Sequence, residues 1–214
     1  MPRILPGETD LYAITDARLS LGRSLHDVVH ALLAAGITLI QYREKNMKMG
    51  KMLQECRMLR AMTREANACF IVDDYVDIAL LCEADGVHIG QDDLPLRDVR
   101  HLVGDTMLIG VSTHSPEQAQ KACDEGADYI GVGPIYATQT KEDVTAPVGL
   151  SYLSWVAHNI SLPYVAIGGI KEHNIGDVVK SGARCCALVS EFVGAQNIAE
   201  KVGAVRRAMH QALL

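Results

Sequence analysis

Short apolar runs separated by helix-like segments recur eight times along this chain, and this repeat limits the folds open to it. The runs are rich in Val and Ile and are apolar on both faces, which is typical of strands in a buried parallel sheet. Several follow a small-residue turn such as Ala34-Ala35-Gly36 or Ser181-Gly182-Ala183. The expected strands cover residues 10–15, 37–42, 69–73, 86–89, 107–111, 129–132, 163–167 and 184–189.

Segments with helical periodicity separate the runs, at 24–34, 50–66, 75–83, 96–103, 115–125, 150–159, 174–181 and 198–213. Ser24 and Ser115-Pro116 are typical helix starts, a capping hydroxyl and a proline at the first helical position. Eight strand-then-helix units predict an α/β (β/α)8 TIM barrel with its active site at the C-terminal face of the strands. A doubly wound open sheet is the alternative. The lack of Gly-x-Gly-x-x-Gly after the first strand, where Thr15–Arg18 stands, weakens it.

Length and composition agree with one domain spanning residues 1–214, with 1–9 as an N-terminal extension. The chain has 214 residues, 49% of them hydrophobic, enough for one large core. A net charge of −6 argues against a nucleic-acid partner. The sequence has no apolar run near the roughly 20 residues of a membrane span and no signal-like start, so we expect a cytoplasmic protein without a membrane partner. The six cysteines form no C-x-x-C pair and read as buried, reduced residues.

Polar clusters follow several of the expected strands, and a parallel barrel brings all strand C-termini to one rim. Gln41, Arg43 and Lys45 alternate, so their side chains point the same way on an extended strand end. A guanidinium and an ammonium side by side form a cradle for a diphosphate. A solvated strand end paired with Glu44 is the alternative.

Carboxylates end two consecutive expected strands, at Asp73-Asp74 and at Asp92-Asp93. Neighbouring strand ends allow Asp74 and Asp93 to share one cation. Oxygen ligands without nearby Cys or paired His favour Mg²⁺. Helix capping competes as an explanation at either site taken alone.

Three further features follow the later strands. Thr138-Gln139-Thr140-Lys141 lies in a long segment, 133–148, that reads as an active-site lid or as an ordinary polar loop. Gly168-Gly169 and Val189-Ser190 follow strands seven and eight, where barrels often bind phosphate. For the glycine pair a tight turn is the alternative.

Three single side chains are weaker candidates. His88, inside a strand, reads as a hydrogen-bonded core histidine. His114 is a candidate for proton transfer. Ser112 is a ligand contact without the neighbours of a nucleophile.

Together these motifs resemble the thiamine phosphate synthase family, through nearly the whole chain from Leu11 to the last helix. The matching segments are Leu11–Asp16, Gln41–Lys45, Asp74–Ala79, Ala84–Asp93, Gly110–His114, Gly133–Tyr136 through Lys141, Ile167–Ile170 and Val189-Ser190. The resemblance implies a barrel that joins hydroxymethylpyrimidine diphosphate to thiazole phosphate, giving thiamine monophosphate and diphosphate.

Residue roles also follow from the resemblance. Asp74 and Asp93 would bind one Mg²⁺ ion. Catalytic roles would fall to Arg43, Lys45, Lys141 and Ser112. The pyrimidine diphosphate would be held by Gln41, Arg43, Lys45, Ser112 and Lys141, and the thiazole phosphate by Thr138, Thr140, Gly169, Val189 and Ser190. Asp73 and Gln139 complete the implied substrate-binding set.

The chain departs from the family pattern at two positions, with Asp73 where Asn is usual and Gln139 where Pro is usual. A carboxylate at 73 would either strengthen metal binding or repel diphosphate, and Gln139 would loosen the lid. A thiazole tautomerase using His114 and a non-catalytic sensor of thiamine phosphates are the competing functions. Arg43→Ala or Lys141→Ala is expected to lower turnover with little change in melting temperature. The sequence leaves a homo-oligomer open.

Overall fold

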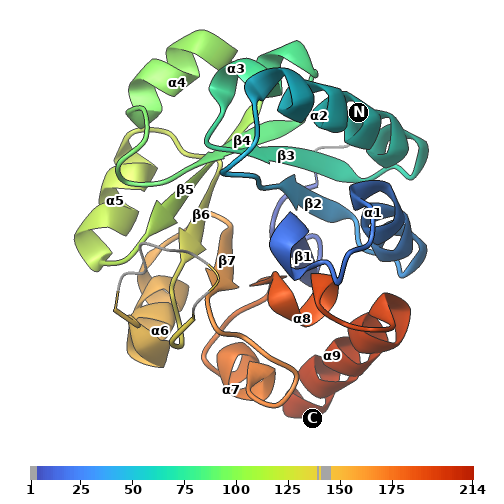
Figure 1. Cartoon of the computed structure of the whole chain (residues 1–214). Helices are drawn as coiled ribbons and strands as arrows, with labels where there is room; N and C mark the ends of the chain where they lie inside the picture. Colours follow the sequence, from blue (N-terminus) through green and yellow to red (C-terminus); the bar gives the residue numbers. More distant parts are fainter. Residues whose placement is uncertain (1–3, 139, 141–145) are drawn as a thin grey trace.

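The computed structural model of this protein describes residues 4–138, 140 and 146–214. Eight parallel strands close into a barrel in sequence order, and β1 pairs with both β2 and β8. Helices surround the strands (Figure 1). The strands are β1 (Leu11–Ile14), β2 (Leu39–Tyr42), β3 (Cys69–Asp73), β4 (Gly86–Ile89), β5 (Leu108–Thr113), β6 (Tyr129–Val132), β7 (Tyr164–Ile167) and β8 (Cys186–Leu188). The predicted (β/α)8 barrel is confirmed.

The helices between the strands lie where the periodicity placed them. They are α1 (Leu25–Ala34), α2 (Met49–Glu65), α3 (Val76–Leu81), α4 (Leu96–Val103), α5 (Pro116–Asp124), α6 (Gly149–Asn159), α7 (Ile175–Lys180) and α9 (Ile198–Ala212). Ser24 and Ser115 do cap α1 and α5, each accepting a backbone N–H three residues on. Two one-turn helices were not predicted, η1 (Ala17–Leu19) and α8 (Ser190–Val193). Elements this short carry no periodic pattern.

The apolar core has two layers. One lies between strands and helices and includes Leu11 and Ala13 of β1. The other fills the barrel and includes Tyr12, Ile14 and Tyr129, with Ile4 and Leu5 packed against it. This alternation along β1 is the two-residue period of a strand. Five of the six cysteines are buried and all six are free thiols, as expected.

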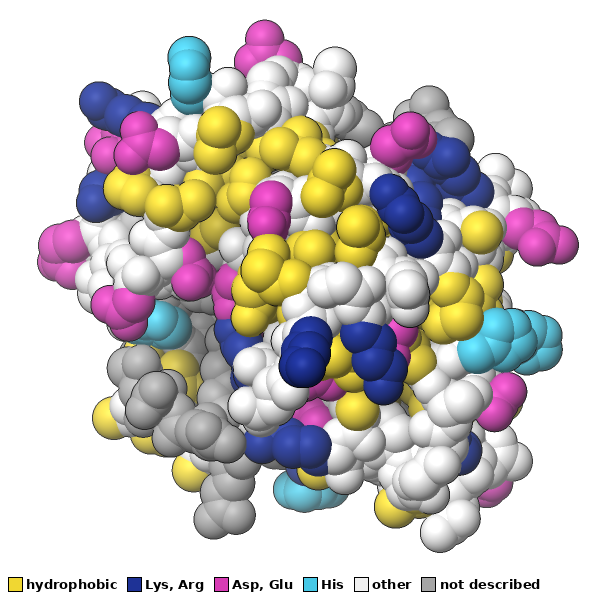
Figure 2. Space-filling view, turned by 45° about the horizontal axis from the view of Figure 1, so that its top comes forward, with side chains coloured by type: hydrophobic (Ala, Val, Ile, Leu, Met, Phe, Trp, Pro, Cys, Tyr) yellow, Lys and Arg dark blue, Asp and Glu magenta, His cyan; other side chains and the backbone are white. Residues whose placement is uncertain are grey.

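Some large apolar side chains remain on the surface. Leu80 and Leu81 of α3, Leu94, and Leu102 of α4 are each at least 40% exposed. Figure 2 turns this part of the molecule forward and shows apolar side chains gathered on it. Exposed leucines are common on folded proteins and do not by themselves identify a partner. No helix among the described residues has the length and apolar character needed to cross a membrane.

Candidate active site

Two buried carboxylates form ion pairs with Arg43 at the C-terminal rim of the barrel. Arg43 Nη1 lies 3.3 Å from Asp16 Oδ2, and its Nε lies 3.7 Å from Asp73 Oδ2. Asp16 also caps η1 by accepting the backbone N–H of Arg18, which fixes the carboxylate just beyond β1. All three charged side chains are nearly out of solvent, with Arg43 only 7% exposed. Mutual charge compensation makes this burial tolerable.

Lys45 completes the cluster from the solvent side. Its ammonium lies 3.4 Å from Asp73 Oδ2 and forms an ion pair with Asp74. The Lys45 side chain is 40% exposed, so a ligand can reach it. Asp73 Oδ2 accepts no hydrogen bond within the described residues and lies between the two cations. Asp73 is therefore the counter-ion of Arg43 and Lys45.

The two expected metal ligands flank the end of β4. Asp74 donates its backbone N–H to the carbonyl of His88 in β4, and it has a positive φ of 61°. Asp93 folds back so that its Oδ2 accepts the backbone N–H of Gly90, at 2.7 Å. The described residues contain no group of three metal-ligating side chains. Two carboxylates suit Mg²⁺ all the same, because this ion usually takes one or two carboxylates and completes its shell with water and substrate phosphate.

The turn after β7 packs tightly against the segment after β6. Gly168 and Gly169 have positive φ values of 98° and 64°. A Cβ on Gly168 would lie 2.5 Å from Pro134 Cα, and one on Gly169 would lie 2.6 Å from the carbonyl oxygen of Ala137. This close approach explains why both positions are glycine.

Ser190 begins α8 beside this turn, and charged side chains surround it. Lys171 donates to the Ser190 hydroxyl at 2.8 Å and lies 3.2 Å from Glu191 Oε2. Lys201 of α9 reaches Glu191 as well, at 3.4 Å. Burial raises the pKa of Glu191, but the Glu172 N–H and the two lysines outweigh it, and the net pKa is below the usual range.

His88 and Ser112 contact each other inside the barrel mouth. His88 Nε2 lies 2.9 Å from Ser112 Oγ, and His88 Nδ1 lies 3.1 Å from the Tyr129 hydroxyl. His88 is thus a hydrogen-bonded interior histidine, as its position in a strand predicted. His114 Nδ1 lies 2.5 Å from the carbonyl oxygen of Gly133, a bond that anchors the start of the loop after β6.

Comparison with known proteins decides the family. A model of the thiamine monophosphate synthase family matches residues 11–192. The chain is 59% identical to the thiamine-phosphate synthase of Lawsonia intracellularis over 212 residues, covering 98% of both chains. It is 60% identical to that of Pelotomaculum thermopropionicum over 199 residues, covering 93% of this chain and 91% of the relative.

The chain belongs to the thiamine monophosphate synthase family. It is accordingly a transferase of thiamine biosynthesis, acting on small-molecule substrates. Among solved structures, thiamine phosphate pyrophosphorylase from Pyrococcus furiosus superposes with a TM-score of 0.86 at 35% identity, covering 96% of this chain and 97% of that one. A 3-hexulose-6-phosphate synthase, at 16% identity and a TM-score of 0.69, shares the fold alone. These findings do not favour the tautomerase alternative.

Part of the expected lid of the synthase is described. Thr138 and Thr140 hydrogen-bond to each other through their hydroxyls at 3.2 Å, and Arg18 of η1 donates to the carbonyl of Thr140 at 3.1 Å. Gln139 and Lys141 lie outside the described residues. Their expected roles in holding substrate therefore stay predictions.

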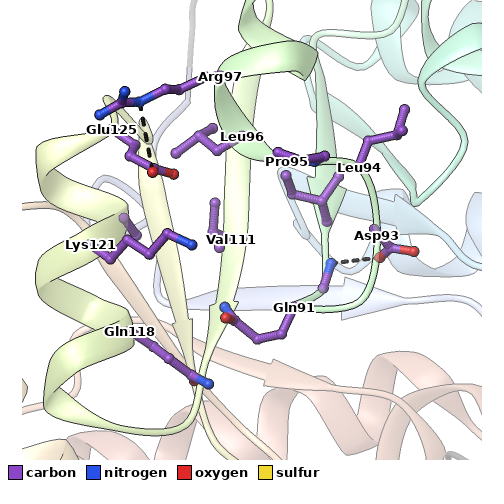
Figure 3. Close-up of a pocket in the computed structure, with 13 residues that line it drawn as sticks. Gln91, Asp93, Leu94, Pro95, Leu96, Arg97, Val111, Gln118, Lys121 and Glu125 are labelled. Carbon is purple, nitrogen blue, oxygen red and sulfur yellow. Dashed lines mark hydrogen bonds and ion pairs between the residues drawn. The ribbon is translucent and has the colours of Figure 1, made fainter.

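A pocket of about 170 Å³ lies outside the barrel mouth, between the loop after β4 and helix α5. Figure 3 shows Lys121 and Gln118 on one wall and Leu94 and Pro95 on the other. Asp93 lines it, but Arg43, Lys45 and Ser112 do not. The charged rim and not this pocket gathers the synthase's expected site residues.

The structure adds residues that sequence reasoning did not select. Asp16 ends one of the matching segments and has no role of its own there, although it binds Arg43. Asn174 accepts the backbone N–H of Lys171 and donates to the carbonyl of Gly169, so it braces the glycine turn. Tyr12 and Tyr129 were assigned only to apolar strands, and nothing in their spacing marks a polar contact. For Asp16, a carboxylate directly after a strand was the available signal.

Proposed function

We propose that this synthase condenses hydroxymethylpyrimidine diphosphate with thiazole phosphate to give thiamine monophosphate and diphosphate. The bond from the pyrimidine methylene to the diphosphate oxygen breaks, and its electron pair leaves with diphosphate. The lone pair of the thiazole nitrogen then forms the new C–N bond. The observation that carries the proposal is the gathering of Arg43, Lys45 and Asp74 at one rim, beside the loop that bears Asp93.

Lys45 and Arg43 supply positive charge where the leaving group gains negative charge. Such preorganised charge lowers the barrier without a nucleophile. Asp16 and Asp73 fix the Arg43 guanidinium, so it needs little rearrangement during the reaction. Lys45 is the mobile arm, able to leave Asp74 for the diphosphate.

Asp74 and Asp93 are the residues that would hold Mg²⁺. The bound ion would neutralise charge on the diphosphate. The Lys45–Asp74 ion pair supports this arrangement, because each partner compensates the other until ligands of opposite charge arrive.

The thiazole phosphate is proposed to lie on the other side of the rim, at Thr138, Thr140, Gly169, Val189 and Ser190. The Ser190 hydroxyl and the backbone N–H groups of the glycine turn are the proposed donors to the phosphate oxygens. Holding both substrates in one mouth makes capture of the pyrimidine cation effectively unimolecular.

Turnover by the purified protein tests the proposal. With Mg²⁺, the pyrimidine diphosphate and the thiazole phosphate, we expect equal amounts of diphosphate and thiamine monophosphate, and loss of both with EDTA. Thiazole tautomerisation without diphosphate release would overturn it. Asp93→Asn is expected to raise the Mg²⁺ concentration needed for half-maximal rate, whereas Asp92→Asn, its exposed neighbour, should not. Equal effects of the two substitutions would refute the assignment of Asp93.

A further inference from the structure

A chain of hydrogen bonds crosses the barrel interior from β2 to β5. Gln41 Nε2 donates to the Tyr12 hydroxyl at 3.0 Å, and that hydroxyl lies 3.1 Å from the Tyr129 hydroxyl. Tyr129 lies 3.1 Å from His88 Nδ1, and His88 Nε2 lies 2.9 Å from Ser112 Oγ. Gln41 and Ser112 lie at its two ends, and the family resemblance implies that both contact the pyrimidine substrate.

A glycine inside β5 makes room for these hydrogen-bonded side chains. A Cβ on Gly110 of β5 would lie 2.5 Å from His88 Nδ1 and would collide with the Tyr129 ring. A Cβ on Gly131 of β6 would lie 3.4 Å from His88 Cε1, an ordinary van der Waals contact, so glycine is not required there. Glycine weakens a strand interior and often marks a close approach. Here the approach is that of the His88 and Tyr129 rings.

With the Gln41 amide nitrogen facing Tyr12, the number of protons fixes the direction of the other bonds. Burial raises the pKa of both Tyr12 and Tyr129, so each keeps one proton to donate. The Tyr12 oxygen accepts a hydrogen bond from Gln41. The Tyr12 hydroxyl therefore donates to the Tyr129 oxygen, and the Tyr129 hydroxyl donates to His88 Nδ1. His88 is then neutral, with its proton on Nε2, and it donates to Ser112.

The opposite direction leaves a proton without an acceptor. If Tyr129 donated to Tyr12, the Tyr12 oxygen would receive two hydrogen bonds while its own proton lost its partner in the chain. Burying a donor without an acceptor is strongly unfavourable. With the Gln41 amide nitrogen facing Tyr12, only one direction gives both tyrosine protons an acceptor.

We infer that this series of hydrogen bonds sets which groups of the pyrimidine site donate and which accept, with Tyr12, Tyr129 and His88 as positioning residues. The inference rests on the proposed function. Ser112 Oγ accepts a hydrogen bond from His88 Nε2. Its own hydroxyl proton is then available to donate to the ligand. Gln41 uses its amide nitrogen in the chain, and within the described residues its Oε1 accepts no hydrogen bond. Gln41 thus presents Oε1 to the ligand as a hydrogen-bond acceptor.

This polarity selects an aminopyrimidine. The exocyclic amine would donate to Gln41 Oε1, and a ring nitrogen on the opposite edge would accept from Ser112. The 4-oxo analogue would place its carbonyl oxygen against that of Gln41. A site built to hydrogen-bond one group discriminates strongly against an analogue that lacks it.

Tyr129→Phe removes the hydroxyl at the centre of the hydrogen-bond series and keeps the aromatic ring. Tyr12 then loses its acceptor, and the Gln41 amide is expected to turn so that Oε1 accepts the Tyr12 proton and the NH₂ group faces the ligand. We expect calorimetry to show about tenfold weaker binding of the 4-amino pyrimidine diphosphate and a smaller preference over the 4-oxo analogue. The KM for thiazole phosphate should not change. Tyr164→Phe, which removes a hydroxyl bonded to the Gly182 carbonyl, is the matched control.

Nitrogen-15 NMR of His88 in the wild-type protein tests the polarity without turnover. We expect a protonated Nε2 and a bare Nδ1, assigned by the signals lost in His88→Gln. A proton on Nδ1 would refute the inference, as would unchanged discrimination in Tyr129→Phe. A wild-type protein that fails to make thiamine monophosphate would instead remove the proposed function, while the histidine signals still report the polarity.

Discussion

Arg43 is proposed to bind substrate, and its surroundings show that it also contributes to folding. Its charge is proposed to act on the diphosphate at the rim, and the side chain is almost completely buried between Asp16 and Asp73. The expectation from sequence that Arg43→Ala would leave stability unchanged does not fit this environment. Removing one partner of a buried ion-pair cluster leaves uncompensated charge, which costs several kcal/mol.

We therefore expect Arg43→Met to lower both turnover and the free energy of unfolding, the latter by about 3 kcal/mol or more in urea titration. Lys45→Met should lower turnover with little change in stability, because Lys45 is 40% exposed. Adding Asp73→Asn to Arg43→Met should restore part of the stability. A wild-type unfolding curve for Arg43→Met would show that the two carboxylates do not need this cation.

Among the elements, α8 is too short to be stable by itself, and ion pairs fix it to its neighbours. Lys171 and Lys201 bind Glu191 of α8, and Lys201 also binds Glu172 at 2.7 Å. The bond to Glu172 is the main cause of a raised pKa at Lys201. This network places Ser190 next to the glycine turn.

The lowered pKa of Glu191 gives this network a pH dependence. The folded protein holds the Glu191 proton more weakly than the unfolded chain does, so the network stabilises the fold above the ordinary pKa of glutamate and loses its effect as the pH falls through the lower folded value. Glu191→Gln should therefore reduce the loss of melting temperature between pH 6 and pH 3, a range chosen to span roughly the titration of carboxylates. Glu200→Gln, an exposed change on α9, should leave the slope as in wild type. An unchanged slope in Glu191→Gln would refute the role of the network.

For the whole molecule, closure of the barrel depends on the two ends of the chain meeting. β1 pairs with β8, and Arg206 of α9 binds Asp10, just before β1, at 2.8 Å and 3.2 Å. Arg206 also donates to the carbonyls of Ala35 and Gly36 at the end of α1. These contacts join segments more than 160 residues apart in sequence.

Arg206→Met should lower the free energy of unfolding by about 1–2 kcal/mol, because several charge-assisted hydrogen bonds are lost at a partly exposed site. Urea denaturation measures the change. Arg207→Met, an exposed arginine one position along, should change stability by less than about 0.5 kcal/mol. Equal effects would mean that α9 is held by its apolar face alone. Turnover should be retained in both variants, because α9 lies away from the proposed chemistry.

The sequence by itself determined the order of the elements and the rim that carries the candidate site. Repeated apolar runs and caps such as Ser24 act within a few residues, so their consequences can be read locally. In a parallel barrel they also fix the side on which residues such as Arg43, Asp74 and Ser190 emerge.

Only the tertiary structure decided the partners of those residues. Asp73 is a counter-ion because Arg43 and Lys45 of the neighbouring strand end reach it. Asp16, at the end of the strand beyond, is the second counter-ion of Arg43. The chain from Gln41 to Ser112 joins side chains of five strands, through two tyrosines that the pattern assigned to an apolar interior. Such contacts depend on distances across the closed barrel, and local sequence carries no record of them.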